Sequence, residues 1–506
     1  MTGSQIEMMI VIAMYMCLLI GIGIYNGKKN KNTEDFYLAG RKLGPFVVAM
    51  SAEASDMSSW LLMGLPGVAY MTGLADAFWT GLGLCAGTYL NWLLVSRKLR
   101  RYSQNLGAYT VPGYFGKRFH DDRHLIDSIA ALMCVVFFTP YVASGFAACG
   151  KLVNSLFGIN YMTGVIFFGV VIIIYTVIGG FTTVATNDFV QSIVMSIALV
   201  TVVGYGIIHS GGMDGVMANA RSMAGYFDLH ALYDSASGSA VNLTTFGIIS
   251  TLAWGLGYFG MPHILVRFMS IEDEEKLVLS RRIGTIWVII AMTVAIFIGI
   301  AGNALSHAGA VPILEDGERI IPVIAGQIAT HGFFPALIGG VIIAGIVAAT
   351  MSTADSQLLV ASSGFTENIV QDFMGKKLDN AQALRLARIT IVVASLIAIF
   401  LARNPDSSVF KIVSFAWGGF GGAFSAVMLL SLFWKRVNRQ GAVAGIISGG
   451  LMIFIWKFLV RPLGGGWDIY ELLPAFIISL VFCVVVSLLT PEPSAEINAE
   501  FDAAGN

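Results

Sequence analysis

The chain has 506 residues, of which 56% are hydrophobic and only 12% are charged, and its mean hydropathy is +0.76. Soluble proteins carry about a quarter charged residues, so these values exclude an ordinary soluble protein and indicate a helical protein that crosses a membrane many times. The net charge of −1 gives no general attraction to nucleic acid. The five cysteines stand singly, without the paired spacing of a zinc site or a disulfide framework.

A membrane-spanning helix needs about 20 mainly apolar residues, and thirteen stretches meet this requirement. They are 5–25, 46–73, 76–96, 124–154, 158–178, 187–209, 242–268, 282–306, 322–366, 384–402, 407–434, 440–460 and 470–490. The first lacks a basic leader and a cleavage site, so we expect a retained helix rather than a signal peptide. The stretch 322–366 exceeds one crossing, and Gly332-Phe-Phe-Pro335 predicts a short helix before the true span.

Basic residues alternate between the connections. Most of the 30 lysines and arginines lie in 28–42, 97–123, 267–282, 376–388 and 435–439. Because connections rich in lysine and arginine stay in the cytoplasm, the pattern predicts a multi-pass protein of the plasma (inner) membrane. Its N-terminus would lie outside and its C-terminus in the cytoplasm. The acidic, alanine-rich tail 491–506 is expected to be disordered.

The glycine- and serine-rich connection 210–241 separates two groups of five spans, 46–209 and 242–434. Because five is odd, the second group must run inverted relative to the first. The rest of the single transmembrane domain, 1–490, consists of an extra N-terminal helix at 5–25 and two extra C-terminal helices at 440–490. Inverted groups with interrupted helices at matching positions indicate a secondary transporter.

Each group begins with a helix that we expect to be interrupted. In Phe46–Gly73, the segment Ser51-Ala-Glu-Ala-Ser-Asp-Met-Ser-Ser-Trp60 places two carboxylates and four hydroxyls at membrane depth. In the second, Trp254-Gly-Leu-Gly-Tyr-Phe-Gly-Met-Pro-His263 contains three glycines and a proline. Ionisable residues and irregular backbone at this depth are costly, and they are typical of a binding site or a transport pathway.

A candidate cation site combines oxygens from two of these stretches. Ala349, Ser352 and Thr353 share one helical face, and the first interruption would free the backbone carbonyls of Ala54 and Met57. Oxygen ligands suit a hard cation, and unwound carbonyls coordinate coupling ions in transporters. The alternative is ordinary hydroxyl-to-backbone bonding and close helix packing.

Four acidic residues are candidates for ion coupling. Asp56 is the foremost, and its alternative role is an ion pair with a buried base. Glu53 has three alternatives: it takes up a proton, lines the inner vestibule or binds a polar partner. Asp188 either serves an ion or favours the dipole at a helix start. Asp355 lies close to Ser352 along the helix, so a second cation or a proton between Asp188 and Asp355 is a further hypothesis.

Four aromatic residues, Trp60, Tyr141, Trp254 and Tyr258, either wall a small cavity or belong to the core and the membrane interface. Trp254 and Tyr258 are one turn apart beside the second interruption, which favours the cavity. A zwitterionic substrate would suit it, since its carboxylate can meet helix N-termini and backbone N–H groups.

Together with Asp35-Phe-Tyr-Leu-Ala-Gly-Arg-Lys-Leu-Gly44 and Met351-Ser-Thr-Ala-Asp-Ser-Gln357, the two interrupted segments resemble the sodium/solute symporter family, and most of all its sodium/proline symporters. The resemblance covers nearly the whole chain. It implies an all-α, leucine-transporter-type fold with a 5+5 inverted-repeat core, and sodium-coupled uptake of L-proline by alternating access.

The resemblance also implies roles for residues. Sodium would bind the carbonyls of Ala54, Met57 and Ala349 and the hydroxyls of Ser352 and Thr353. Asp56 and Asp188 match family acids. The proline-binding positions would be Ser58, Tyr141, Trp254, Tyr258 and Pro262.

This sequence departs from related proline carriers at four positions. Glu53 and Ser59 replace glycine, Met261 replaces glutamine, and Asn187 replaces threonine. The substrate therefore has an alternative: another amino acid, a small carboxylate or a vitamin. An intramembrane enzyme is disfavoured because HExxH, GxSxG and Walker A motifs are missing, and a sensor because the tail is too short for a signalling domain. We expect no obligate protein partner.

Overall fold

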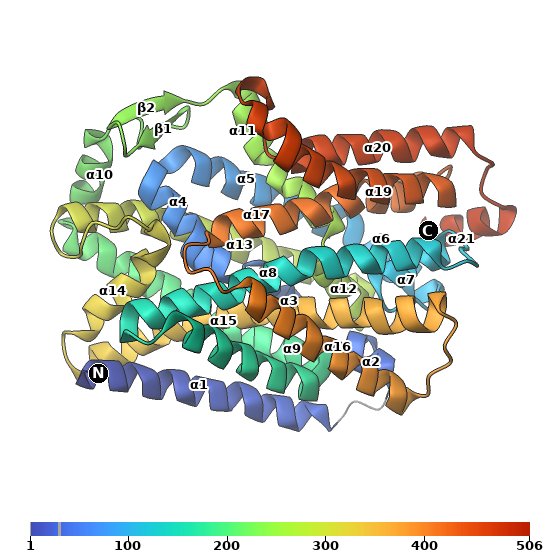
Figure 1. The fold of residues 1–506 in the computed structure, drawn as a ribbon, viewed down its shortest axis with the longest axis horizontal. Helices are drawn as coiled ribbons and strands as arrows, with labels where there is room; N and C mark the ends of the chain where they lie inside the picture. Colours follow the sequence, from blue (N-terminus) through green and yellow to red (C-terminus); the bar gives the residue numbers. More distant parts are fainter. Residues whose placement is uncertain (1, 29–31, 506) are drawn as a thin grey trace.

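The computed structural model describes residues 2–28 and 32–505, so Lys29 and Lys31, two of the basic residues used to orient the chain, lie outside the described residues. The long helices lie roughly along one axis, and the two termini lie at opposite ends of it (Figure 1). Large apolar side chains such as Ile10, Val200 and Phe400 are exposed on the flanks. Because helices with such flanks are stable in lipid rather than in water, this is an all-α membrane protein.

Nine helical segments in the described residues are long and apolar enough to cross a membrane, and a bent helix pair makes ten. The α-helical parts of the nine are α1 (Gly3–Gly27), α8 (Leu125–Phe157), α9 (Tyr161–His209), α13 (Leu277–His307), α15 (Phe333–Ser363), α16 (Asn380–Leu401), α17 (Val409–Phe420) with α18 (Ala426–Phe433) in one segment, α19 (Arg439–Ile455) and α20 (Leu472–Leu489). The bent pair, Thr245–Gly260 with Pro262–Ser270, is the tenth.

The predicted count of thirteen spans is therefore not confirmed. The predicted spans 158–178 and 187–209 lie together in the 49-residue α9, which bends at Gly180, where φ is 64°. The predicted spans 46–73 and 76–96 are each divided into shorter pieces. These pieces are α3 (Pro45–Asp56), the π-helical turn η2 (Trp60–Gly64), α4 (Leu65–Thr72), α5 (Leu74–Leu90) and the π-helical turn η3 (Asn91–Val95).

The predicted interruption of the first helix is confirmed. Helix α3 ends at Asp56, and Ser58 adopts a positive φ of 27°, a conformation that costs energy in a residue with a side chain. The Ser58 hydroxyl accepts a hydrogen bond from the Trp60 backbone N–H at 3.0 Å. Serine therefore supplies the local hydrogen bond that the broken helix cannot make.

The second predicted interruption is confirmed as well. Helix α11 (Thr245–Leu252) continues as the 3₁₀ segment η4 (Ala253–Gly260), and α12 (Pro262–Ser270) follows after an extended Met261. The two parts meet at 45°. Pro262 is the first residue of α12, where its missing N–H leaves no helical hydrogen bond unmade.

Shorter elements connect the spans or form parts of them. They are α2 (Thr33–Leu38), η1 (Ala39–Arg41), α6 (Ser96–Asn105), α7 (Val111–Arg118), α10 (Gly212–Ser222), β1 (Ala231–Asp234), β2 (Ser239–Asn242), η5 (Glu274–Lys276), η6 (Gly317–Arg319), α14 (Ile320–Ala329), η7 (Gly364–Phe373), η8 (Gly421–Ser425), η9 (Trp456–Val460), η10 (Arg461–Leu463) and η11 (Gly465–Trp467). Strands β1 and β2 form an antiparallel hairpin. Helix α14 is the short helix predicted before the span that starts at Phe333.

The interrupted helices lie inside the molecule. Helices α9 and α15 pack side by side, and α3 packs against α9, α13, α12 and α15. Helix α15 is buried from Ile342 to Ser363. The polar residues of α3 and α15 therefore face protein rather than lipid.

The expectation that the tail is disordered was wrong. Residues Ala495–Gly505 form helix α21, which packs on α6. The Glu500 carboxylate lies 2.9 Å from His120 Nε2, and Lys435 Nζ donates to Asp502 at 2.5 Å. The Phe501 ring lies 5.2 Å from the guanidinium carbon of the buried Arg118. Composition alone did not show that the tail has a docking surface.

We expect Phe501→Ala to release α21. The substitution removes the apolar anchor and its contact with a guanidinium, which contributes about 0.5–1 kcal/mol. In hydrogen exchange, the amides of 495–504 should lose protection at least tenfold, while α9 and α15 keep theirs. Phe373→Ala, at an exposed phenylalanine, is the control. Unchanged protection in 495–504 would contradict the docking role of Phe501.

Candidate functional site

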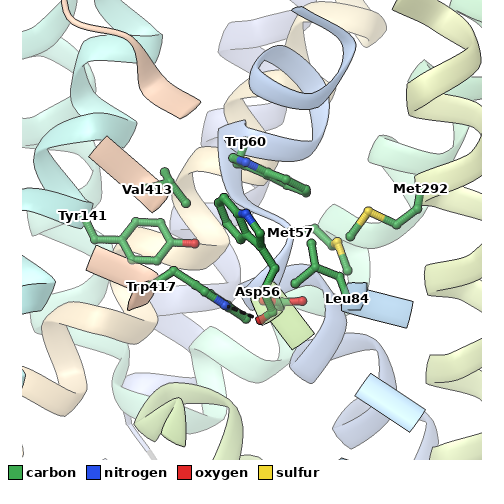
Figure 2. A pocket seen from close by; sticks show the side chains of 9 residues that line it. Asp56, Met57, Trp60, Leu84, Tyr141, Met292, Val413 and Trp417 are labelled. Carbon is green, nitrogen blue, oxygen red and sulfur yellow. Dashed lines mark hydrogen bonds between the residues drawn. The ribbon is translucent and has the colours of Figure 1, made fainter. Parts of the chain in front are cut away.

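A small cavity, with about 230 Å³ of empty space including its open side, lies beside the break in the first helix (Figure 2). Its wall comes from the broken helices and from α5, α8, α13 and α17. The lining residues are Asp56, Met57, Trp60, Leu84, Tyr141, Trp254, Met292, Val413 and Trp417. Of the predicted aromatic set, Trp60, Tyr141 and Trp254 are thus brought together. One carboxylate in a mainly apolar and aromatic wall is typical of a small-molecule site.

Asp56 is the charged group of this cavity. Its carboxylate accepts a hydrogen bond from the Tyr258 hydroxyl, which places Tyr258 directly behind the cavity wall. The Tyr258 ring packs edge-to-face on Trp417, whose indole N–H donates to the Trp254 carbonyl at 2.8 Å. No ion pair joins Asp56 to a basic residue in the described part of the chain. Its negative charge is therefore available to a cation.

Four of the five predicted cation ligands meet directly next to this cavity. The Ser352 hydroxyl on α15 lies 2.8 Å from the Ala54 carbonyl on α3 and 3.2 Å from the Ala349 carbonyl. The Thr353 hydroxyl donates to the same Ala349 carbonyl at 3.2 Å. A cation here would replace hydrogen bonds by ion–oxygen contacts. The Met57 carbonyl accepts from Leu61 N–H at 3.0 Å, so it keeps a helical bond.

The remaining predicted substrate residues are divided between two other spaces. Ser58 lines a polar cavity together with Tyr141 and Thr353, so it lies between the first cavity and the candidate cation ligands. Pro262 lines a third cavity with Phe181, away from Trp254. Met261 is fully buried and is not among the lining residues of the first cavity.

Asp188 and Asp355 belong to a buried network whose central residue the sequence did not indicate. The Arg267 guanidinium on α12 lies 2.9 Å from the Asp188 carboxylate, and neither side chain is exposed. It also donates to the Ser51 and Ser356 hydroxyls at 2.8 Å and 2.5 Å. Counting Arg267 among the residues of a cytoplasmic connection was therefore wrong, because it lies inside the protein.

The network also changes the interpretation of both acids. Asp188 lies two turns beyond the bend of α9 at Gly180, so it does not cap a helix start. Its charge is balanced by Arg267. Asp355 accepts a hydrogen bond from the Tyr175 hydroxyl at 2.8 Å, and Ser356 bridges it to Arg267.

Glu53 has a polar partner, which is one of its three predicted alternatives. The Trp92 indole N–H donates to its carboxylate at 2.8 Å, and Glu53 is 2% exposed. The Trp92 ring packs on Phe268, with ring centres 4.4 Å apart. Glu53 therefore lies on the η3 and α12 side of α3, outside the lining of the small cavity.

A wide vestibule of about 1,630 Å³, including its open mouth, lies on the other side of Phe410. The Phe410 ring packs on Trp60 and on Trp254, with ring centres 6.0 Å and 5.5 Å apart. Its backbone N–H donates to Glu318 at 3.1 Å, and Lys151 donates to the same carboxylate at 2.8 Å. Lys151 is thus paired with Glu318. The rings of Trp60, Trp254 and Phe410 separate the vestibule from the small cavity.

Interrupted helices around a buried cavity that holds one carboxylate, with a wide vestibule beside it, are typical of a secondary transporter. The comparisons with known proteins agree with this class. The model of the sodium:solute symporter family matches residues 36–449, and the chain belongs to that family. It is a transporter, not an enzyme.

Curated relatives match along almost the entire length. The osmoregulated proline transporter OpuE of Bacillus subtilis (strain 168) is 39% identical over 491 residues, which cover 97% of this chain and 96% of OpuE. The sodium/proline symporter of Staphylococcus aureus (strain JH9) is 38% identical over 501 residues, covering 97% and 94%.

Solved structures support the leucine-transporter-type fold. A sodium-coupled sialic acid symporter in a substrate-bound, outward-open state superposes with a TM-score of 0.79 at 19% identity, covering 96% of this chain and 99% of that chain. MhsT in complex with L-phenylalanine superposes with a TM-score of 0.55 at 14% identity, covering 88% and 97%.

Proposed function

We propose that this protein couples the entry of sodium to the uptake of L-proline by alternating access. The observation that carries this proposal is that two relatives named for proline transport, from two organisms, align with 97% of the chain at 38–39% identity. The cavity supports it, because a single carboxylate in an aromatic wall is typical of a site for a small organic molecule. Met261 replaces a glutamine of related proline carriers and was a reason to consider another solute. It does not line this cavity.

In this proposal sodium binds between the Ala54, Met57 and Ala349 carbonyls and the Ser352 and Thr353 hydroxyls. Asp56 supplies the nearby negative charge. Proline occupies the adjoining cavity against Tyr141 and Trp254, with Ser58 and Tyr258 at its edges, and Pro262 acts by ending the broken segment. We assign Asp188 and Asp355 to the Arg267 network rather than to a second cation.

Sodium and substrate favour each other because they order the same broken helix. Sodium joins α3 to α15 at Ala54 and Ser352, which fixes the residues that wall the substrate cavity. The substrate then binds at a lower cost in conformational entropy, and by linkage it strengthens sodium binding to the same degree. The membrane potential adds about 2.3 kcal/mol per charge for each 100 mV.

We further propose that the protein lies in the cell membrane, with its N-terminus outside the cell and its C-terminus in the cytoplasm. Helices α6, α7 and α21 gather at the same end of the molecule as the C-terminus (Figure 1). That end carries the basic connection 97–123. The two five-helix groups, 46–209 and 242–434, would then cross the bilayer in opposite directions, between the extra helix 5–25 and the extra pair 440–490.

The test is uptake into proteoliposomes. An inward sodium gradient should drive the accumulation of labelled L-proline, and an equal potassium or proton gradient should not. A panel of unlabelled amino acids, small carboxylates and vitamins then identifies the substrate by competition. Proline should compete best. Sodium-driven uptake of another solute with no inhibition by proline would overturn the proline assignment but leave sodium symport intact.

Trp254→Ala is expected to raise the KM for proline at least about tenfold and to change the sodium dependence less than threefold. The indole forms part of the cavity wall together with Tyr141, and loss of a large aromatic side chain removes about 1.5–3 kcal/mol of apolar contact. Trp456→Ala, outside the cavity lining, is the control. A larger change in the sodium dependence than in KM would reassign Trp254 to the ion.

A further inference from the structure

A second group of metal-binding side chains lies far along α8 from the small cavity. His124 and Asp127 stand at the start of α8, and Asp372 stands near the end of η7. One ligand atom from each lies within 4.8 Å of the other two. This group does not belong to the proposed sodium and proline sites.

The three side chains are held in place by neighbouring residues. The Asp127 side chain is 4% exposed, and its carboxylate accepts the Ser128 backbone N–H at 3.0 Å and lies 3.1 Å from His124 Nδ1. A side chain at position 116 would have its Cβ 3.0 Å from the same carboxylate, so Gly116 on α7 leaves the space that Asp127 occupies.

Asp372 is oriented in a similar way. Its carboxylate accepts a hydrogen bond from the Asn368 side-chain amide at 3.1 Å. The Asn368 amide oxygen in turn accepts from the Thr110 hydroxyl at 3.1 Å. Outer partners of this kind fix the direction of metal-binding side chains in known metal sites.

The basic side chain of Lys117 makes its hydrogen bond to a backbone carbonyl rather than to either acid. The Lys117 ammonium donates to the Gly107 carbonyl at 2.7 Å, and no ion pair joins it to Asp127 or Asp372 within the described ranges. Two carboxylates beside an imidazole nitrogen offer three ligand atoms to a divalent ion.

We propose that His124, Asp127 and Asp372 bind a divalent transition-metal ion of the zinc type. An imidazole nitrogen beside carboxylate oxygens suits zinc and its neighbours rather than sodium, calcium or magnesium. Ligand atoms around a tetrahedral zinc ion lie about 3.4 Å apart, so each side chain needs to move by only about 1 Å. Water completes the coordination.

The ion would tie two helices that also build the transport site. Helix α8 carries Tyr141 of the small cavity, and η7 continues α15, which carries Ser352 and Thr353. Fixing the N-terminal end of α8 to the C-terminal end of η7 would limit the movement of these two helices relative to each other. Metal binding is thus expected to stabilise the fold of the transporter.

The experiment uses the purified full-length protein after treatment with a chelator. Zinc is titrated in competition with a chromophoric chelator, and thermal unfolding is recorded with and without zinc. The test variants are His124→Asn and Asp372→Asn. Asparagine is chosen at position 124 because His124 has a φ of 52°, which asparagine accepts more readily than most residues. Asp127 is left intact because it is buried and bonded to the helix start.

The wild type should bind one zinc ion that also raises its unfolding temperature. Each variant should weaken this binding at least tenfold and lose most of the shift in unfolding temperature. His230→Asn and Asp122→Asn, which alter exposed residues, should behave like the wild type. Equal zinc binding in the wild type and both test variants would overturn the site, as would equal losses in the two controls. Neither readout depends on sodium or proline transport.

Discussion

Asp56→Asn is expected to raise the sodium concentration for half-maximal uptake by about ten- to one-hundredfold. The Asp56 carboxylate is 6% exposed, and its hydrogen-bond partner is the uncharged Tyr258. Removing one charge at several ångströms from a cation costs a few kcal/mol at the effective dielectric constant of a protein. Asparagine keeps the size of the side chain, so the change isolates the charge.

The measurement is the initial rate of proline uptake against sodium concentration, at saturating proline. Asp122→Asn removes an exposed acid and should leave the curve unchanged. Tyr258→Phe should shift the curve in the same direction as Asp56→Asn but less, because the hydroxyl only orients the carboxylate. A normal sodium dependence in Asp56→Asn would refute the role of Asp56 in sodium binding.

Arg267→Met is expected to lower the free energy of unfolding by about 3–5 kcal/mol. The substitution leaves the unexposed Asp188 carboxylate without its positive partner, and breaking a buried ion pair from one side has a cost of this size. The Ser51 and Ser356 hydroxyls lose a donor at the same time. Thermal unfolding of the purified protein measures the loss.

A double variant distinguishes a lost charge from a lost side chain. Adding Asp188→Asn to Arg267→Met removes the unpaired charge and should restore more than half of the stability. Arg282→Met, at an exposed arginine, should change stability by less than about 0.5 kcal/mol. If the double variant loses as much free energy of unfolding as its two single variants together, Arg267 stabilises the protein by packing and not by balancing the charge of Asp188.

The sequence predicted the positions at which the membrane helices break. The hydroxyls and carboxylates around Ser58 compete with the helix for backbone hydrogen bonds, and the glycines before Pro262 weaken the second helix. Both effects are local and can be inferred from the sequence. The pairing of Ala54 with Ser352 followed from the same reasoning plus a family resemblance. Such features depend on short stretches, so the sequence carries them directly.

Features that depend on tertiary packing were not predictable. Arg267 follows an apolar run and looks like the basic flank of a span, yet α12 turns inward after the break and buries it. Trp417 and Val413 wall the cavity from α17, a helix that has neither an acidic residue nor a proline to indicate a site. An arginine within the run His263–Met269 was the one available signal for the buried network, since arginine at such depth needs an acidic partner.

Gly284 on α13 leaves the space that the Glu53 side chain of α3 occupies. A Cβ at position 284 would lie 2.6 Å from the Glu53 carboxylate oxygen that accepts the Trp92 N–H. The two positions are therefore linked in size: an alanine at 284 displaces the carboxylate and breaks its bond to Trp92, whereas a glycine at 53 makes room for it. Alanine at 284 is therefore expected to be tolerated better in a chain that carries glycine at 53 than in this one.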